Sequence, residues 1–357
     1  MDRSSPPVKT KIQVTFKKGI ELMISQPGFS RREALSLFGL TAAALVAKQS
    51  YAHAPQSEST SANAPLIYRF RIGDFSAVAV SDGFLKLTDP QSFYAPQESP
   101  AEFQALLKDW CVPPDRVFLP FNVLLIDTGR ERVLIDAGNG ESADRLNPAL
   151  GQAQAACKSA GYSAEDISVV FLSHGHPDHL GGLVTPDNKP TYPDAHHFVL
   201  KTEFDFWTSP NPDLSAGLAP DELKKYVLQF AQKRFPVLKD RFVTIDDGTE
   251  FTPGFKAMLA PGHTPGHTIV DIQSGSERLL HIVDLAHHQV VPLQKPAWKP
   301  NVDTDPEPAA RTRQKIFAQV ANDRTRIFGY HLPFPGLGHI RVSGSGYEWI
   351  AEPWSPV

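Results

Sequence analysis

Hydrophobic and polar positions alternate over several short stretches of this chain, and the pattern predicts strands joined as hairpins. The runs Asn122–Asp127 and Arg132–Asp136 flank Thr128-Gly129-Arg130, a combination typical of an antiparallel hairpin. Ile167–Leu172 is apolar at every position except Ser168 and is rich in β-branched residues, as expected of a strand covered on both faces. Similar runs predict further strands at Lys256–Leu259, Thr268–Ile272, Leu279–Val283 and Arg326–Tyr330.

Helical spacing of apolar residues marks three other segments. Ala143–Ala160 is rich in alanine and is followed by Gly161, which is typical of a helix C-cap. Ala219–Phe235 and Pro306–Ala321 also have the spacing of amphipathic helices. The order is not the strict βαβ alternation of a doubly wound sheet, and no glycine-rich phosphate loop follows a strand. The pattern therefore predicts a mixed α/β fold that contains hairpins.

Residues 1–54 have the organisation of a twin-arginine export signal. Ser30-Arg31-Arg32 is followed by an apolar run, Ala34–Ala47, and then by the small-residue pattern Ala52-His53-Ala54. The run has 14 residues, fewer than the roughly 20 that span a bilayer. We therefore expect a periplasmic or secreted protein with no stable membrane span after processing. A buried N-terminal helix and an uncleaved anchor are the alternatives, and either Met1 or Met23 could be the true start.

The Ser/Ala/Pro-rich stretch 55–65 is expected to be a flexible linker, followed by the folded domain over 66–357. The whole chain has a net charge of −4. Residues 1–54 contain eight basic and three acidic residues, so the remaining chain has a net charge of −9. Such a chain has no electrostatic footprint for nucleic acid, and a small-molecule substrate is expected instead. A homodimer is left open.

The composition restricts the metal chemistry that this chain can perform. Thirteen histidines stand beside only two cysteines, which excludes an all-cysteine zinc site and an iron–sulfur cluster held by four thiolates. Any metal site must therefore use histidine and carboxylate. Cys111 and Cys157 could pair in an oxidising compartment or remain free thiols, and the sequence leaves both possibilities open.

The strongest chemical signal is Ser173-His174-Gly175-His176-Pro177-Asp178-His179, directly after the Ile167–Leu172 run. Three histidines and an aspartate lie within six residues, where a turn at a strand end can direct several side chains into one cleft. Imidazole and carboxylate are suitable zinc ligands. This spacing indicates a metal site rather than packing.

Three later segments add to this signal. His263 lies in Pro261-Gly262-His263-Thr264, Asp284 follows Val283, and His331 begins His331-Leu332-Pro333. The resulting pattern HxHxDH…H…D…H resembles that of the metallo-β-lactamase-fold hydrolases, and within them most resembles the exported methyl parathion hydrolase subgroup. The resemblance covers about Tyr68 to Tyr347. It implies an α/β fold, the metallo-β-lactamase αββα sandwich, with two mixed β-sheets between helical layers.

The resemblance also implies a ligand set for two Zn²⁺ per chain. One metal is assigned to His174, His176 and His263, and the other to Asp178, His179 and His331, with Asp284 bridging the two. Two cations about 3.5–4 Å apart can lower the pKa of a shared water, so that a bridging hydroxide attacks the substrate. Asp178 and Asp284 are therefore expected catalytic residues, and Asp178 could also orient the hydroxide or carry its proton.

Two polar residues are expected to support ligands rather than to bind metal. His267 is four positions from His263, which suggests a hydrogen bond to a ligand or support of the turn. Asp136 lies at a predicted strand end, where it could orient a ligand histidine or serve only as a turn residue.

His287 is the third expected catalytic residue, and it occupies a position where the resembling families have a different residue type. The quorum-quenching lactonases carry tyrosine three positions after the bridging aspartate, and the methyl parathion hydrolase resemblance suggests an apolar residue there. An imidazole could donate to a substrate carbonyl. Trp207 matches a pocket tryptophan of that subgroup, and Phe121 and Tyr226 are expected pocket residues by position.

The predicted function is that of a dinuclear zinc hydrolase that cleaves small neutral esters, lactones or phosphotriesters. The bridging carboxylate at Asp284 weighs against β-lactam hydrolysis, because several true β-lactamases of the fold have cysteine or no bridging acid there. A metallo-β-lactamase and a non-catalytic zinc-binding periplasmic protein are the alternatives.

Overall fold

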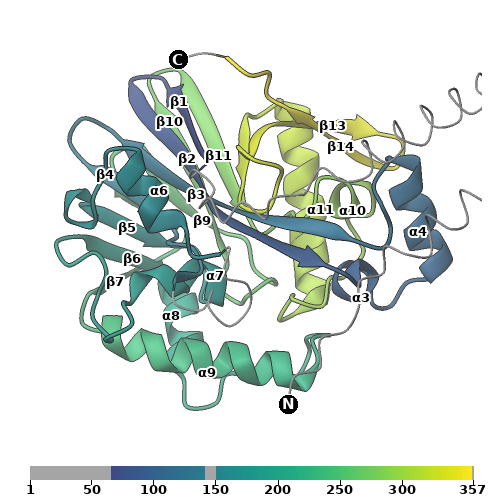
Figure 1. Cartoon of the computed structure of the whole chain (residues 1–357), viewed down its shortest axis with the longest axis horizontal. Helices are drawn as coiled ribbons and strands as arrows, with labels where there is room; N and C mark the ends of the chain where they lie inside the picture. Colours follow the sequence, from purple (N-terminus) through teal and green to yellow (C-terminus); the bar gives the residue numbers. More distant parts are fainter. Residues whose placement is uncertain (1–65, 141–149, 356–357) are drawn as a thin grey trace, which may run out of the picture. The chain divides into compact units, whose positions relative to one another are not determined.

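The computed structural model describes residues 66–140 and 150–355, which form two seven-stranded sheets (Figure 1). In spatial order the first sheet contains β1 (Ile67–Ile72), β2 (Phe75–Leu87), β3 (Val117–Asp127), β4 (Arg132–Ile135), β5 (Val169–Leu172), β6 (His196–Leu200) and β7 (Phe242–Ile245). The second contains β14 (Gly346–Ala351), β13 (Leu337–Ser343), β12 (Ile327–Gly329), β11 (Glu277–Val283), β10 (Thr268–Ser274), β9 (Phe255–Leu259) and β8 (Glu250–Thr252).

Both sheets are mixed, as predicted. Strands β1 to β4 pair antiparallel, and β4 to β7 pair parallel. In the second sheet β8 to β11 pair antiparallel, β11 and β12 pair parallel, and β12 to β14 pair antiparallel. Strands β9, β11 and β12 therefore run in the same direction, and their carboxyl ends lie at one edge of the second sheet.

The central core lies between the two sheets. Leu124 and Ile126 of β3 and Phe171 of β5 pack in one buried cluster with Phe255 and Val270 of the second sheet. The intervening residues on β3 have the opposite orientation, because successive side chains of a strand point to opposite faces. This explains why the interior strands are apolar at nearly every position rather than at alternate ones.

Helices cover the outer faces of both sheets (Figure 1). On the first sheet, Val123 and Leu125 pack with residues of α6 (Ala153–Ser159), α7 (Pro177–Leu180), α8 (Lys201–Thr208) and α9 (Asp221–Leu238). On the second, α10 (Val291–Gln294) and α11 (Pro306–Asp323) pack over β9 to β12. The remaining helical elements are α3 (Pro90–Tyr94), α4 (Pro100–Asp109) and the 3₁₀ turns Ala164–Asp166 and Gly181–Leu183. The predicted αββα sandwich is confirmed.

One predicted helix is shorter than expected. Residues 141–149 lie outside the described residues, and α6 begins only at Ala153. Gly151 has a φ of 74°, a left-handed conformation that interrupts a helix. Gly161, at a φ of 93°, follows the end of α6 as the C-cap pattern predicted. The other predicted strands and helices are confirmed with small shifts at their ends.

The predicted export signal and linker lie outside the described residues. Among the described residues, no helix combines the length and the apolar character required to cross a bilayer. Cys111 is exposed and Cys157 is buried, and both are free thiols in the structure.

Candidate metal centre

The predicted ligands gather where four strands end. The β5 loop, defined here as the segment from Ser173 to the end of the short helix α7, contains His174, His176, Asp178 and His179. The second sheet contributes single residues after β9, β11 and β12. Because those three strands run in the same direction, their following residues emerge at one edge of the sheet. This edge faces the β5 loop, so residues up to 157 positions apart in sequence meet in one site.

The first ligand group contains His174, His176 and His263. Nδ1 of His176 lies 3.1 Å from Nε2 of His174 and 2.9 Å from Nε2 of His263. The two Nε2 atoms are 3.2 Å apart. A neutral imidazole has one donor and one acceptor nitrogen, so three rings that meet through one nitrogen each cannot all satisfy one another. The arrangement fits a shared cation.

The second group contains Asp178, His179 and His331. Oδ2 of Asp178 lies 3.3 Å from Nε2 of His179 and 3.5 Å from Nε2 of His331. The two histidines are almost completely buried, whereas Asp178 is partly accessible. Two imidazoles and one carboxylate form a donor set that suits zinc.

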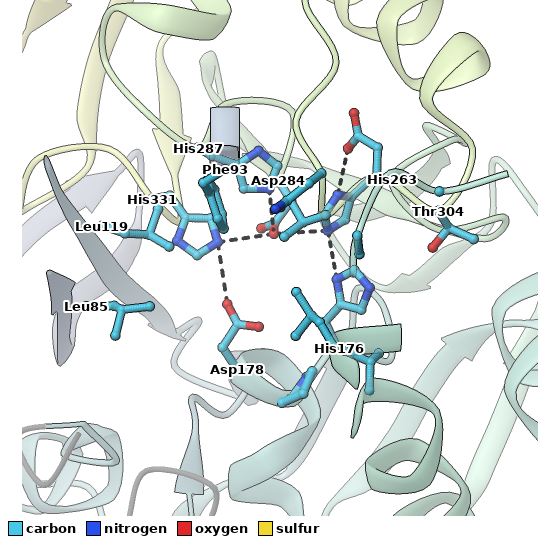
Figure 2. A pocket seen from close by; sticks show the side chains of 18 of the residues that line it. Leu85, Phe93, Leu119, His176, Asp178, His263, Asp284, His287, Thr304 and His331 are labelled. Atoms are coloured by element: carbon cyan, nitrogen blue, oxygen red, sulfur yellow. Dashed lines mark hydrogen bonds and ion pairs between the residues drawn. The ribbon is translucent and has the colours of Figure 1, made fainter. Parts of the chain in front are cut away.

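Asp284 lies between the two groups. Its Oδ1 is 3.2 Å from Nε2 of His179, and its Oδ2 is 3.1 Å from Nε2 of His331 and 3.2 Å from Nε2 of His263. Figure 2 shows the side chains of His176, His263, His331 and Asp178 arranged around this carboxylate. The structure thus brings together all seven predicted metal ligands, with the Asp284 carboxylate in contact with both groups.

Unpaired buried atoms provide a test of whether these residues fit a metal. Among the described residues, Nε2 of His179 and Oδ1 of Asp284 are buried without a hydrogen-bond partner. Such groups are costly to bury unless a ligand satisfies them. Both atoms belong to the predicted ligand set, and two cations at the two groups would satisfy them. The residues present therefore fit a dinuclear centre.

The electrostatics favour metal binding at three of the predicted ligands. Burial lowers the pKa values of His174 and His176 well below the usual range, which keeps both imidazoles neutral. Burial by itself raises the pKa of Asp284, but the nearby imidazoles of His331 and His179 outweigh this effect and hold it well below its usual range. Neutral imidazole and ionised carboxylate are the forms that bind metal.

At His179 and His263 burial lowers the pKa, but Asp284 and other nearby carboxylates outweigh this effect. They raise the pKa of His263 to about 9 and that of His179 well above its usual range. Both rings therefore release a proton when a metal binds.

Asp136 contacts the predicted ligand His179, which agrees with the first of its two expected roles, the orientation of a ligand histidine. Its Oδ2 lies 2.8 Å from Nδ1 of His179 and accepts a 2.7 Å hydrogen bond from the hydroxyl of Ser173. Its Oδ1 accepts a 2.8 Å bond from the backbone N–H of Ser173. These contacts fix the His179 ring so that Nε2 points toward Asp284.

His267 supports the bridging residue. Its Nδ1 donates to the carbonyl of Ala260 at 2.9 Å, and its Nε2 accepts a 3.2 Å bond from the backbone N–H of Asp284. Burial lowers the pKa of His267 to about 3, so the ring is neutral. Both ring nitrogens are occupied, which leaves no nitrogen for a metal.

The backbone before Asp284 is strained. Val283 has a φ of 48°, and the pairing of β11 with β12 is irregular between His281 and Val283. A β-branched residue in the left-handed region is a conformational outlier that costs about 1–3 kcal/mol. The turn ends the strand and directs Asp284 toward the ligand groups.

Asp303 also supports a ligand, and no sequence motif identified it. Its Oδ1 lies 3.0 Å from Nδ1 of His263, and its Oδ2 accepts a 2.9 Å bond from the buried guanidinium of Arg313. Burial raises the pKa of Asp303, but Arg313 and His263 outweigh this effect and hold it at about 2. Asp303 thus orients His263 as Asp136 orients His179.

A cavity of about 270 Å³ opens above the ligands. Its wall is mainly apolar and includes Leu85, Leu119 and Val227, whereas ligands form its floor (Figure 2). The expected pocket residues Phe121 and Tyr226 line this cavity.

Trp207 does not line the cavity, contrary to its expected role. It is fully buried, and its indole N–H donates to Glu203 at 2.6 Å. Its ring lies behind His176, with ring centres 6.1 Å apart. The indole packs and hydrogen bonds in the interior and is not available to a substrate.

His287 lies on the cavity floor, beside the bridging carboxylate. Its Nε2 is 3.3 Å from Oδ2 of Asp284, and its ring centre is 4.9 Å from that of His263. Neither ring nitrogen has a hydrogen-bond partner among the described residues. Burial lowers its pKa to about 4, so the ring is neutral and carries one N–H donor.

The fold and the site define the class of protein. Residues 117–331 match the family model described as the metallo-beta-lactamase superfamily. The chain belongs to the metallo-beta-lactamase superfamily of hydrolases, which confirms the family and fold expected from the sequence.

Two solved structures illustrate the relationship. The chain is 33% identical to AidC, a dizinc quorum-quenching lactonase in complex with a product, with a TM-score of 0.77 over 82% of this chain and 99% of that chain. It is 29% identical to AbOPH, a hydrolase in the beta lactamase superfamily, with a TM-score of 0.72 over 81% of this chain and 98% of that chain.

Curated relatives match over shorter stretches. An N-acyl homoserine lactonase from Bacillus cereus is 24% identical over 184 residues, which cover 47% of this chain and 64% of the relative. The atrochrysone carboxyl ACP thioesterase of Passalora fulva is 36% identical over 95 residues, which cover 26% of this chain and 25% of the relative. The chain therefore spans less than two thirds of the length of either relative.

Proposed function

We propose that this protein is a dinuclear zinc hydrolase that opens small neutral lactones and cleaves related esters. The observation that carries the proposal is the position of Asp284, which joins two ligand groups on the floor of an apolar cavity. The similarity to AidC supports a lactone substrate, because that protein is a dizinc lactonase in complex with N-hexanoyl-L-homoserine.

Each group on the cavity floor has a separate task. Zinc bound at the two groups would supply Lewis acidity and lower the pKa of a water to near neutrality. Asp178 lines the cavity and can orient that water and accept its proton. Asp284 contacts both groups, and His287, which lines the cavity, can donate its N–H to a substrate carbonyl oxygen.

The apolar lining of the cavity favours some substrates over others according to their polarity. Its apolar wall favours an uncharged substrate with a hydrocarbon portion, because burying such a group is favourable whereas burying an unpaired charge is not. A neutral phosphotriester fits the same description, so organophosphate hydrolysis and membership of the methyl parathion hydrolase subgroup stay predictions.

A substrate panel tests the proposal. The zinc-loaded protein should hydrolyse acyl lactones and aryl esters with a kcat/KM at least about tenfold above its value for the β-lactam nitrocefin. Paraoxon in the same panel tests the phosphotriester prediction. Preferred turnover of nitrocefin would support the β-lactamase alternative. Two bound metals without turnover of any substrate would support a non-catalytic zinc-binding protein.

His287→Phe tests the substrate-side role. Phenylalanine preserves a ring but removes the N–H, so kcat/KM for lactones should fall about 100-fold, as expected for the loss of one oxyanion donor. Metal content, measured by elemental analysis, should stay at two per chain. Loss of a metal would instead identify His287 as a ligand, a role that its proximity to His263 and Asp284 also allows.

Export and assembly are separate proposals that depend on the sequence. We propose a twin-arginine route to the periplasm or beyond, based on Arg31 and Arg32. Replacing both arginines with lysine should retain the protein in the cytoplasm in a fractionation experiment. The homodimer stays a prediction for light scattering to test.

A further inference from the structure

Glu203 is a completely buried carboxylate that contacts none of the predicted metal ligands directly. It lies in the first turn of α8, on the outer side of the first sheet. Burial raises its pKa, and four hydrogen bonds oppose this effect. A buried charge without such partners would be strongly destabilising, so its retention here needs a reason.

Every polar contact of this carboxylate is made by a donor. Oε1 accepts bonds from the backbone N–H of Gly175 at 2.8 Å and from the indole N–H of Trp207 at 2.6 Å. Oε2 accepts bonds from the hydroxyl of Thr264 at 2.7 Å and from the backbone N–H of Gly266 at 2.9 Å. The environment is therefore built for an acceptor at both oxygens.

These donors belong to two separate ligand loops. Gly175 lies between His174 and His176, and Thr264 follows His263. One carboxylate thus connects the loop after β5 with the loop after β9, and these two loops provide the whole first ligand group.

The glycines in both loops permit this close approach. A Cβ atom added to Gly175 would lie 2.4 Å from Nε1 of Trp207. A Cβ atom added to Gly266 would lie 2.3 Å from the backbone nitrogen of Glu203. Both distances are too short for a side chain, so the two loops pack directly against α8.

We propose that Glu203 is a positioning residue that sets the distance between the two loops and thereby the geometry of the His174, His176 and His263 metal group. The inference rests on the proposed dinuclear centre. Trp207 then has a role different from that expected: it holds the Glu203 carboxylate rather than contacting substrate.

Glu203→Gln tests this arrangement with a minimal change in shape. Glutamine replaces one acceptor oxygen with an NH₂ group. At the Oε1 position this group would face the N–H donors of Gly175 and Trp207, and at the Oε2 position it would face the N–H of Gly266, although the Thr264 hydroxyl could rotate to accept from it.

The expected result is about 10–100-fold weaker binding of one of the two metals, the range typical of residues that support metal ligands. Binding of the second metal should stay within about twofold of wild type, because Glu203 does not contact the Asp178, His179 and His331 group.

The measurements are a zinc titration by calorimetry and the visible absorption spectrum of the cobalt-substituted protein. The cobalt spectrum should change in the band of the affected metal, which a loss of general stability would not produce. Glu203→Asp keeps the charge but shortens the side chain, and it should restore part of the affinity. Asp205→Asn is the matched control, since Asp205 is an exposed carboxylate on the same helix, and it should behave as wild type.

Thr264→Val provides a second test if the glutamine variant does not fold. It removes only one donor to Oε2, so the affinity for the same metal should fall by a smaller factor. Folded variants that bind both metals with wild-type affinity and spectrum would overturn the proposal. These titrations use no substrate, so a wild-type protein that binds two metals but hydrolyses no lactone would refute the proposed function and leave this inference intact.

Discussion

The two sheets contribute to the predicted metal centre in different ways. The first sheet provides four predicted ligands from a single segment, between His174 and His179, directly after β5. The second sheet provides His263, Asp284 and His331 from three loops, after β9, β11 and β12. One half of the site is therefore local in sequence, and the other half exists only once a sheet has formed.

This difference explains where the supporting contacts lie. The β5 loop is fixed by Asp136 at the end of the neighbouring strand β4. Two of the predicted second-sheet ligands contact residues outside that sheet: Nδ1 of His263 lies 3.0 Å from Oδ1 of Asp303, and Nδ1 of His331 lies 2.8 Å from the carbonyl oxygen of Pro120 in β3.

The third predicted second-sheet ligand, Asp284, is supported by His267 beside β10 of the same sheet. Since Asp284 approaches ligands of both halves, it is the residue on which their connection depends most.

Asp284→Ala should have the largest effect, because it removes the connection between the two halves. We expect kcat/KM to fall by more than about 100-fold, beyond the range for residues that only support ligands, with loss of at least one metal. Elemental analysis and a lactone assay measure the two effects.

Asp271→Ala is the matched control for this variant. Asp271 is a partly buried carboxylate on β10 of the same sheet, where it pairs with Arg278 away from the ligands. It should retain both metals and full activity. An Asp284→Ala protein with two metals and wild-type turnover would show that the halves do not need this bridge.

Asp303→Asn tests the second-sheet half of the site, because Asp303 supports the predicted ligand His263. The amide keeps the shape but cannot accept from both His263 and Arg313 through ionised oxygens, so metal affinity should fall about 10–100-fold. Zinc titration measures the change. Asp305→Asn, at an exposed position two residues further, should leave affinity unchanged. Equal affinities for both variants would mean that His263 does not depend on this carboxylate.

The same difference decided what the sequence could predict about the site. The cluster from His174 to His179 is visible in the residues themselves, because four ligands lie within one turn. His263, Asp284 and His331 were assigned only through resemblance to a family pattern, since nothing local distinguishes them from other polar residues. Asp303 has no local signal at all: its role depends on how the segment before α11 packs against His263.

The pocket was also only partly predictable, because the sequence does not show which side chains are buried away from the cavity. Trp207 was expected to contact substrate because it matches a pocket tryptophan of the methyl parathion hydrolase subgroup, but such a match does not show whether the indole faces the cavity or a buried carboxylate. For the fold, interior strands such as β5 were predictable because both faces are covered. Outer strands such as β14 alternate too weakly, since half-buried and exposed residues follow one another there.

The cavity shows the same division between the halves, and its wall should produce the smallest effect. Most apolar lining residues come from the first-sheet side, such as Leu85 on β2, Leu119 on β3 and Val227 on α9. The second-sheet side contributes mainly polar floor residues and the apolar residue Val302. The first-sheet side should therefore largely determine the preference for substrate chain length. Burying one methylene contributes about 0.8 kcal/mol, so kcat/KM should rise about fourfold per methylene of the acyl chain until the cavity is filled.

Val227→Phe should reduce this gain, because the larger ring occupies part of the 270 Å³ cavity. We expect kcat/KM to fall several-fold for long acyl chains and to change less than about twofold for the shortest, with two metals still bound. Val243→Phe, on the exposed side of β7, is the control and should leave the chain-length series unchanged. An equal loss for all chain lengths in Val227→Phe would mean that α9 affects the metal floor as well as the wall, and the division of the site between the two sheets would not hold.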